Sequence, residues 1–189
     1  MRIGICGGTF DPFHRGHLEP VLAARAAMGW DRIIYVPAAQ QPFKADRTMA
    51  SGYHRFAMAQ LATRSQEDVW VTPMELERGG TSYTVDTLEA FQRLSPDAEL
   101  DWIIGDDNVA DLDRWKDPQR LFALARFVVL TRTGAADDPR LVYAKNETVP
   151  VSATEIRRRV RAGEPIDAFV DPLVSRYIHH YGLYKEGQM

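Results

Sequence analysis

Two histidines follow the first apolar run of the chain, within the sequence GGTFDPFHRGH. His14 and His17 are three residues apart at the start of a helix that opens near Gly16, so both imidazoles can point to the same spot. A pair of N–H donors there would stabilise negative charge that develops on a phosphate. Gly7 and Gly8 would let a phosphate approach the main chain closely, and the helix start adds free N–H groups and the positive end of its dipole. We therefore expect this segment to bind an anion.

This histidine pair has two other interpretations. With Asp11 nearby it could ligate a metal, but no further close ligand completes a site, and no protein metal site is predicted. The histidines could also be structural, since histidine often packs without a role. The chain has neither the dinucleotide-binding pattern G-x-G-x-x-G nor the Walker pattern G-x-x-x-x-G-K-[ST], which argues against a Rossmann dehydrogenase and a P-loop kinase.

A second candidate phosphate site lies near the C-terminus, where the chain reads VSATEIRRR. Ser152 with a glutamate three residues later is a capping-box pattern, which predicts that a helix begins here. The helix start, the hydroxyls of Ser152 and Thr154, and the Arg157 guanidinium would together bind a pyrophosphate leaving group. The alternative is a well-capped amphipathic helix with Ile156 and Val160 on its core face and its arginines, including the two after Arg157, in solvent.

The elements that must position these residues alternate along the chain. Short apolar runs predict strands at residues 2–6, 32–36, 69–72, 101–104 and 127–131. Apolar residues at helical spacing predict helices at residues 18–28, 52–64, 85–94, 118–125, 153–161 and 172–181, the last with Gly182 as its cap. We interpret residues 134–148 as a loop that carries one short strand around 141–144. The alternation predicts βαβ crossovers, hence a doubly wound, Rossmann-like α/β fold with a parallel sheet and C-terminal helices.

Length and composition limit the class of protein further. The 189 residues predict a single domain over 1–189, with average hydrophobic and charged fractions of 45% and 26%. A net charge of −3 provides no overall field for nucleic acid or an anionic membrane, so neither partner is expected. Cys6 is the single cysteine, lies in an apolar strand and excludes an internal disulfide, which favours the cytoplasm. We see no signal peptide and no apolar run long enough to cross a bilayer.

The first segment closely resembles the signature of the nucleotidyltransferase superfamily that carries a [HT]-x-G-H motif, and its GGTFDP form is typical of bacterial nicotinate-nucleotide adenylyltransferases. The second segment resembles the superfamily's I-S-x-T-x-x-R motif, with Val151 in place of isoleucine. In the family this helix start binds the β- and γ-phosphates of ATP. The resemblance covers nearly the whole chain and thins between residues 133 and 150.

The resemblance implies an enzyme that joins ATP and nicotinate mononucleotide to give nicotinate adenine dinucleotide and pyrophosphate. Mg²⁺ would bridge the ATP phosphates, bound mainly by those phosphates and water. Because the substrate's own phosphate is the nucleophile, no protein nucleophile is needed, and His14 and His17 would be catalytic by stabilising charge. The residues implied for ATP binding are Gly7, Gly8, Thr9, Phe10, Gly16, Lys44, Gly105, Asp107, Arg132, Ser152, Thr154 and Arg157.

Three residues are implied for the second substrate. Thr84 lies in the family's S-Y-T-x-D-T stretch, and its amide would meet the nicotinate carboxylate. Trp115 would stack on the pyridine ring, and Lys116, where the family usually has an aromatic residue, would act through its main-chain amide. From the sequence alone, Thr84 could equally be a structural cap and Trp115 could cover a helix junction.

Other functions stay open at this point. The acceptor could be nicotinamide mononucleotide or, as in a sister family, phosphopantetheine. The chain could also be a nucleotide-sensing module without turnover, or a metal-dependent hydrolase that uses the two histidines. The sequence does not distinguish a monomer from a homo-oligomer.

Overall fold

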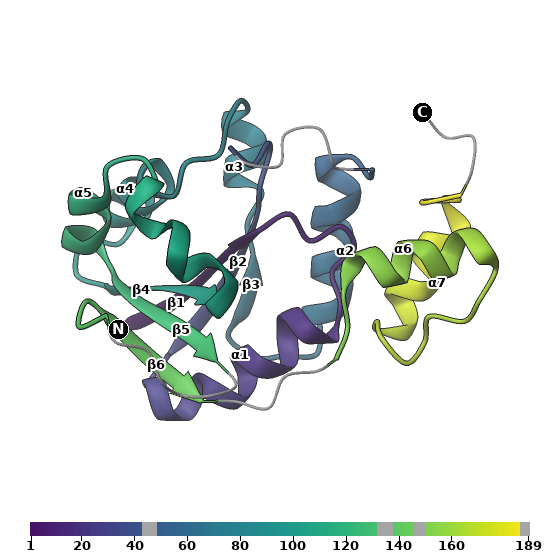
Figure 1. The fold of residues 1–189 in the computed structure, drawn as a ribbon, viewed down its shortest axis with the longest axis horizontal. Helices are drawn as coiled ribbons and strands as arrows, with labels where there is room; N and C mark the ends of the chain where they lie inside the picture. The colour runs from purple at the N-terminus through teal and green to yellow at the C-terminus, as the bar shows by residue number, and fades with distance from the viewer. Residues whose placement is uncertain (43–48, 132–137, 146–149, 186–189) are drawn as a thin grey trace.

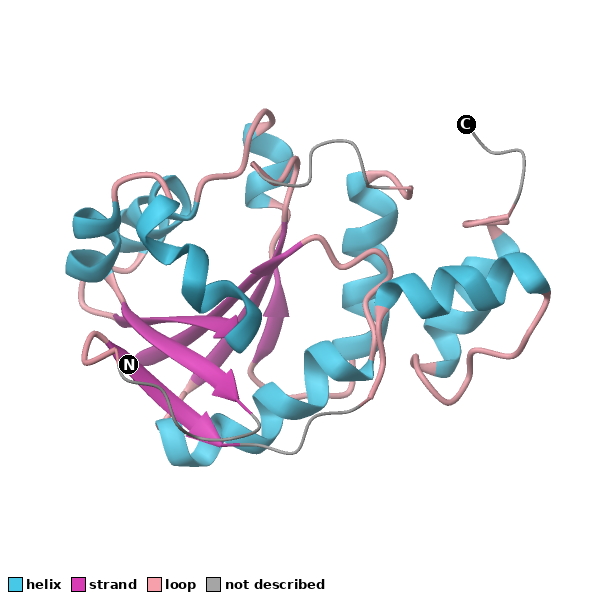
Figure 2. Ribbon diagram, in the orientation of Figure 1, coloured by secondary structure: helices cyan, strands magenta, loops and turns pink. Residues whose placement is uncertain are grey.

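Six parallel strands form one sheet in the order β3-β2-β1-β4-β5-β6 (Figures 1 and 2). The computed structural model describes residues 1–42, 49–131, 138–145 and 150–185. The strands are β1 Arg2–Gly8, β2 Arg32–Pro37, β3 Val69–Val71, β4 Glu99–Gly105, β5 Arg126–Thr131 and β6 Leu141–Lys145. The predicted doubly wound sheet is confirmed, and β6 is the short strand expected in the loop after β5.

Helices cover both faces of the sheet (Figure 2). The predicted helices are observed as α1 Arg15–Met28, α2 Gly52–Thr63, α4 Thr84–Leu94, α5 Pro118–Leu124, α6 Ala153–Ala162 and α7 Pro172–His180. Gly29 and Gly182 adopt left-handed φ values of 71° and 63° directly after α1 and after the end of α7, where glycine is the favoured residue. The expected cap at Gly182 is therefore confirmed one residue beyond the C-cap, Tyr181.

Two helical elements were not predicted. The helix α3 spans Met74–Arg78, which is too short to show a helical period, and the 3₁₀ helix η1 spans Asp106–Arg114. Within η1 only Leu112 is buried, because the segment is rich in aspartate and lies on the surface. Its polar composition therefore resembles that of a loop.

The core has one layer on each side of the sheet. Along β1, Ile3 and Ile5 pack with α4 and α5, whereas Cys6 packs with α1 and α2. Burial raises the pKa of the Cys6 thiol, as expected for an unreactive core cysteine. The alternation matches a strand covered on both faces.

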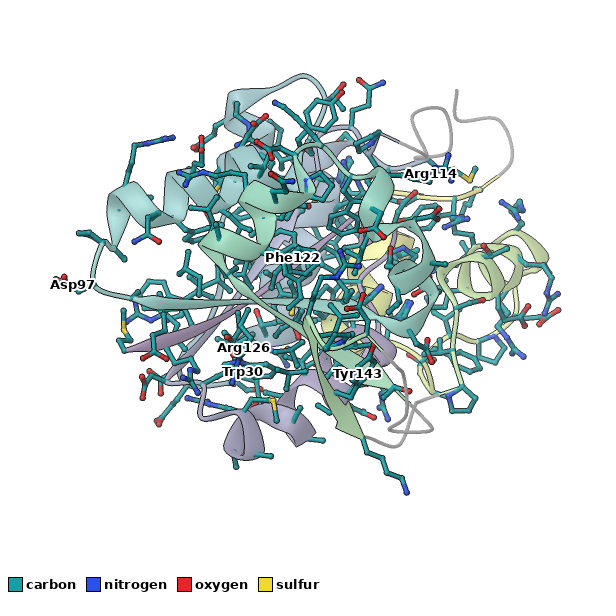
Figure 3. The ribbon with its side chains drawn as sticks, turned by 60° about the vertical axis from the view of Figure 1, so that its left-hand side comes forward. Trp30, Asp97, Arg114, Phe122, Arg126 and Tyr143 are labelled. Atoms are coloured by element: carbon teal, nitrogen blue, oxygen red, sulfur yellow. The ribbon has the colours of Figure 1, made fainter. Side chains whose placement is uncertain are left out.

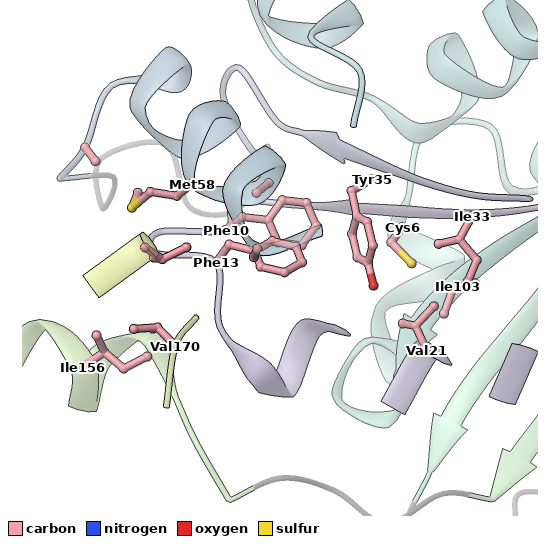
Figure 4. Close-up of a cluster of buried hydrophobic side chains, with 14 of the residues drawn as sticks. Cys6, Phe10, Phe13, Val21, Ile33, Tyr35, Met58, Ile103, Ile156 and Val170 are labelled. Atoms are coloured by element: carbon pink, nitrogen blue, oxygen red, sulfur yellow. The ribbon is translucent and has the colours of Figure 1, made fainter. Parts of the chain in front are cut away.

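The C-terminal helices α6 and α7 lie beside α2 and share the hydrophobic cluster of α1 and α2 (Figure 1). Ile156 of α6 and Val170, just before α7, pack into the cluster that contains Phe10 and Phe13 from the loop after β1 (Figure 4). This packing brings residues far apart in sequence to the carboxyl end of β1.

The amino end of the sheet is built around a buried carboxylate. Asp101 is 1% exposed and accepts hydrogen bonds from Trp30 Nε1 at 2.7 Å and Arg126 Nε at 2.9 Å. Trp30 and Arg126 are labelled in Figure 3. Asp101 stabilises the amino end of the sheet, opposite the expected ligand crevice. That crevice is expected at the carboxyl ends of β1 and β4, where the strand order reverses.

Candidate active site

The two histidines meet at the start of α1, directly after the β1 loop. Their rings stack with centroids 3.6 Å apart and an interplanar angle of 19°. The His14 main-chain N–H donates to His17 Nδ1 at 3.2 Å. Because Nδ1 of His17 accepts this bond, a neutral His17 carries its proton on Nε2 and can donate from there. The structure brings both rings to one place, face to face.

Burial keeps this pair neutral at physiological pH. His14 is 7% exposed, and burial lowers its pKa to about 4. Burial also lowers the pKa of His17, and the neighbouring His14 adds to that shift. Within the described part of the chain, the buried Nδ1 of His14 has no hydrogen-bond partner. The pair can therefore offer uncharged N–H donors.

Aromatic side chains of the hydrophobic core pack against the histidine pair. The Phe10 ring lies edge-on to His17 at 5.0 Å, and the Tyr35 hydroxyl donates to the His17 carbonyl at 2.9 Å. Phe10 is only 5% exposed and has a φ of 53°. The Phe10 ring is therefore buried in the core, and only the main chain of Phe10 remains for the predicted contact with ATP.

The glycines of the first segment make room for protein side chains. A Cβ on Gly7 would lie 2.5 Å from the Trp102 ring, and one on Gly8 would lie 2.8 Å from the Phe10 ring. A Cβ on Gly16 would lie 2.9 Å from Val151 Cγ1. The prediction assigned Gly7 and Gly8 to the approach of a phosphate, but internal packing by itself requires all three glycines.

Two buried charges outside the predicted substrate-binding residues fix the β1 loop. Asp11, 3% exposed, accepts main-chain hydrogen bonds from Met49 at 2.8 Å and Ala50 at 3.2 Å. Arg55 of α2, 2% exposed, donates to the carbonyls of Thr9 at 2.6 Å and Ala38 at 2.7 Å. Asp11 stands inside the GGTFDP signature, whereas nothing around Arg55 in the sequence predicts a buried guanidinium.

The two predicted phosphate segments lie side by side. Ser152 is the N-cap of α6, and its Oγ accepts from the Glu155 N–H at 3.2 Å, as predicted. Arg157 donates from Nη1 to the Asp11 carbonyl at 2.6 Å and from Nη2 to Thr154 Oγ1 at 3.3 Å. The starts of α1 and α6 therefore adjoin across 146 residues of sequence.

The two arginines after Arg157 form ion pairs on the surface of α6. Arg158 pairs with Glu155 at 2.9 Å and Glu164 at 2.7 Å, and Arg159 pairs with Glu155 at 2.8 Å. Arg159 also lies over the Phe169 ring at 4.8 Å. Arg158, whose side chain is 48% exposed, is solvated as predicted, whereas Arg159, at 29%, is half-buried. Both are also paired, because the acidic partners lie within one helical turn or just past the helix end.

At the carboxyl end of β4, Asp107 folds back over Gly105. A Cβ on Gly105 would lie 2.6 Å from Asp107 Oδ1, so a larger residue there would displace this exposed carboxylate. Asp107 is exposed and accepts from Asn108 Nδ2 at 2.8 Å. Because β4 pairs with β1 and the strand order reverses between them, Asp107 lies where the topology predicts a ligand crevice.

The residues predicted for the second substrate lie around the start of α4. Thr84 is the first residue of α4, which leaves its N–H outside the helical hydrogen-bond ladder. Lys116 Nζ pairs with Asp86 of the same turn at 2.8 Å and lies 4.7 Å from the centre of the Tyr83 ring. Trp115 is half-buried and lies 6.2 Å, edge-on, from Phe127. The side chain of Lys116 thus connects the segment after η1 to α4, a role that the sequence did not predict.

A buried carboxylate lies beneath this helix start. Glu75 of α3, 3% exposed, accepts a hydrogen bond from the Thr87 hydroxyl, and Arg78 also donates to that hydroxyl at 2.9 Å. Burial raises the pKa of Glu75. The cluster couples the unpredicted helix α3 to α4.

Comparison with known proteins places this arrangement in a family. The profile of the cytidylyltransferase-like family matches residues 5–159. The chain is 42% identical to a protein of Gemmatimonas aurantiaca named probable nicotinate-nucleotide adenylyltransferase, over 98% of this chain and 93% of that protein. A protein of Roseiflexus with the same name is 39% identical over 97% of this chain and 98% of its own length. This chain belongs to the nicotinate-nucleotide adenylyltransferase family.

Solved structures share the fold of this family member. The Plasmodium falciparum nicotinic acid mononucleotide adenylyltransferase complexed with NaAD matches with a TM-score of 0.78 and 22% identity, over 97% of each chain. The same enzyme complexed with APC also has a TM-score of 0.78, at 19% identity, over 97% of this chain and 96% of that one. At these identities the likeness concerns the fold.

Two predicted phosphate contacts of this adenylyltransferase-family chain, Lys44 and Arg132, lie outside the described residues. Over the described ranges, no group of three or more His, Cys, Asp or Glu side chains is arranged to hold a metal ion. The same ranges contain no helix long and apolar enough to cross a membrane.

Proposed function

We propose that this enzyme transfers the AMP group of ATP to nicotinate mononucleotide, giving nicotinate adenine dinucleotide and pyrophosphate. The observation that carries the proposal is the junction of the α1 and α6 helix starts, which Arg157 and Asp11 connect at 2.6 Å. Two helix N-termini that face one region provide N–H donors and positive dipole ends for a triphosphate. The start of α4, with Thr84, is available for the second substrate.

The reaction is an in-line displacement at the α-phosphorus of ATP. A phosphate oxygen of nicotinate mononucleotide forms the new P–O bond, and the bond from the α-phosphorus to the oxygen shared with the β-phosphorus breaks. Pyrophosphate leaves with that electron pair. Since the attacking phosphate is already an anion, the chain needs to supply only positions and charge stabilisation.

His14 and His17 supply donors to the oxygens of the α-phosphate. The Nε2–H of His17 is free to donate because its Nδ1 is occupied by the His14 main-chain N–H. Both rings are neutral before ATP binds, and the negative charge of the triphosphate then favours their protonated forms. Each donor strengthens as charge accumulates on the phosphate in the transition state.

The start of α6 holds the leaving group. The Ser152 hydroxyl, the free N–H groups of the first turn and Arg157 bind the β- and γ-phosphates, and Thr154 orients Arg157 through its 3.3 Å hydrogen bond. Lys44 and Arg132 add positive charge to the same phosphates. The remaining contacts with ATP come from the main chain of residues 7–10 and from Gly16, Gly105 and Asp107.

The nicotinate ring lies between Trp115 and the start of α4. Its carboxylate meets the Thr84 N–H and the Lys116 main-chain N–H, close to the cationic Lys116 side chain. The two N–H donors and the positive end of the α4 dipole favour an acidic ring over an amide. ATP would enter as its Mg²⁺ complex, in which the ion would neutralise phosphate charge.

We also propose that the enzyme works in the cytoplasm and needs no nucleic-acid or membrane partner. The support is a net charge of −3 and a single cysteine, which is buried. We propose that the whole chain, 1–189, acts as one nucleotidyltransferase domain, because α6 and α7 share a hydrophobic cluster with α1 and α2.

Pyrophosphate release from Mg²⁺·ATP tests the function, with nicotinate mononucleotide, nicotinamide mononucleotide and phosphopantetheine as parallel acceptors. We expect nicotinate mononucleotide to give the highest kcat/KM. Faster release with another acceptor would replace the proposed substrate. Binding of ATP without pyrophosphate release would indicate a sensing module, and metal-dependent cleavage of simple esters alone would indicate a hydrolase.

A further inference from the structure

Asp11 is the meeting point of three segments that are distant in sequence. Its Oδ2 accepts from the Met49 N–H at 2.8 Å, and its Oδ1 accepts from the Tyr184 hydroxyl at 2.7 Å. Its main-chain carbonyl accepts from Arg157 Nη1 at 2.6 Å. Asp11 therefore connects the β1 loop, the segment before α2, the start of α6 and the chain after α7.

Tyr184 reaches this point from the segment that follows α7. The chain turns through Gly182 and Tyr184, whose φ values of 63° and 67° are both left-handed. For a tyrosine such a backbone is unfavourable and persists where surrounding contacts require it. The side chain is 4% exposed, and burial together with Asp11 raises its pKa, so the hydroxyl keeps its proton and donates to the carboxylate.

Asp11 is rigidly placed in turn by its surroundings. Besides the bond from Tyr184, its carboxylate accepts the main-chain N–H of Ala50 at 3.2 Å. Arg55 fixes the carbonyls of Thr9 and Ala50 at 2.6 and 3.2 Å. Loss of the Tyr184 hydroxyl would leave a buried carboxylate with one donor fewer, and such a group shifts toward other donors or water.

We infer that Tyr184 is a positioning residue for ATP, acting through Asp11 on Arg157. The inference rests on the proposed assignment of the α6 start to the triphosphate. Arg157 is half-buried, and it uses one N–H on the Asp11 carbonyl and another on Thr154, which sets the plane of its guanidinium. A shift of Asp11 turns that plane and also moves the loop that carries His14. The C-terminal segment thus sets the geometry of the phosphate site without touching the substrates.

The test compares two tyrosine-to-phenylalanine variants of the full chain. Tyr184→Phe removes only the hydroxyl that reaches Asp11. Tyr177→Phe is the matched control, because the Tyr177 hydroxyl makes its hydrogen bond to His54 Nδ1 at 2.9 Å, between α7 and α2. Calorimetry measures the dissociation constant for Mg²⁺·ATP, steady-state kinetics measures kcat and both KM values, and thermal unfolding measures Tm.

We expect Tyr184→Phe to weaken ATP binding about 10-fold, the effect of losing one buried hydrogen bond to a charged group. Its KM for nicotinate mononucleotide should stay at the wild-type value. Tyr177→Phe should bind ATP as the wild type does, with a smaller fall in Tm because its hydrogen bond is only partly buried. Wild-type ATP affinity in Tyr184→Phe, or equal losses in the two variants, would overturn the inference and leave Tyr184 with a structural role.

A double variant tests the route through Asp11. Asp11→Asn keeps the shape of the side chain and replaces one acceptor oxygen by a donor. If Tyr184 acts through Asp11, the double variant should bind ATP no more weakly than Asp11→Asn alone. Additive losses would show a separate route and overturn the inference. If Asp11→Asn fails to fold, the comparison of Tyr184→Phe with Tyr177→Phe still decides.

ATP affinity also separates this inference from the proposed function. A wild-type protein that binds ATP but releases no pyrophosphate with nicotinate mononucleotide would refute the proposed function, while Tyr184→Phe would still test the positioning role. A wild-type protein that does not bind ATP would overturn both.

Discussion

His14 and His17 differ in what surrounds their ring nitrogens. The Nδ1 of His17 accepts from the main chain, which leaves the proton of a neutral ring on Nε2, whereas the Nδ1 of His14 is buried without a partner in the described part of the chain. The stacked rings share one orientation because the first turn of α1 holds both. A substrate phosphate would therefore meet a donor pair whose geometry is set before binding.

We expect His17→Ala to lower kcat by about 10²-fold or more, as loss of a transition-state donor typically does. His54→Ala, which removes a histidine of α2 that bonds Tyr177, is the control and should keep wild-type kcat. The measurement is pyrophosphate release at saturating substrates, with circular dichroism to establish folding. A folded His17→Ala enzyme with near wild-type kcat would contradict the catalytic assignment.

Lys116 illustrates how an exposed ion pair can matter for binding more than for stability. Its side chain and that of Asp86 are 48% and 35% exposed, so the pair contributes little to folding. We expect Lys116→Ala to raise KM for nicotinate mononucleotide up to about 5-fold, within the range of an exposed pair, and to leave KM for ATP unchanged. Arg120→Ala, which removes a similarly exposed pair with Glu89 of α4, is the control and should leave both KM values unchanged. An equal effect of the two variants would show that the Lys116 side chain does not contribute to the substrate site.

At the scale of elements, the candidate site lies at the starts of three helices. The helices α1, α4 and α6 begin at residues 15, 84 and 153, and each start lies in a segment predicted to bind substrate. The helices behave alike as packing units, since each buries an apolar side against the sheet or its neighbours. What distinguishes their ends is the unpaired N–H groups, which can bind anions.

The caps of α6 and α2 provide a matched test of this idea. Ser152 accepts from Glu155 N–H at 3.2 Å, and Ser51 accepts from His54 N–H at 3.3 Å. Because both are N-caps, Ser152→Ala and Ser51→Ala should each lower the free energy of unfolding by about 1 kcal/mol, measured by urea denaturation. Only Ser152→Ala should raise KM for ATP. An unchanged KM would limit Ser152 to capping α6.

At the scale of the whole molecule, the buried histidines make stability depend on pH. The unfolded chain protonates His14 near its ordinary pKa of 6.5, whereas burial lowers the folded value to about 4. The unfolded state therefore binds more protons in this window, and the free energy of unfolding falls as pH drops from 6.5 to 4. From His14 alone the full loss is about 3 kcal/mol, and His17 shifts in the same direction.

Urea denaturation at several pH values between 7.5 and 4 measures this dependence. His14→Asn should show a flatter profile than the wild type, whereas His180→Asn, which removes an exposed histidine, is the control. Identical slopes in His14→Asn and wild type would show that His14 is not buried as a neutral group.

Local sequence determined most of the elements and indicated the family. The apolar runs and helical spacings predicted β1 to β6 and six of the helices, because each pattern acts over a few neighbouring residues. The GGTFDPFHRGH and VSATEIR segments predicted two helix starts for the same physical reason, and their resemblance indicated the family. By contrast, α3 and η1 are too short or too polar to show a period.

Only the tertiary structure decided how these parts meet. Asp11 binds Tyr184 across 173 residues, and Arg55 is buried among carbonyls of two loops. The tertiary structure also showed that Gly7 and Gly8 face aromatic side chains of the protein, and that the Lys116 side chain reaches α4. Such contacts depend on which surfaces the folded layers bring together, and a buried polar group bonds to whatever partner lies in reach there. The residues next to a buried polar group in the sequence do not indicate which group it will bond to in the folded protein.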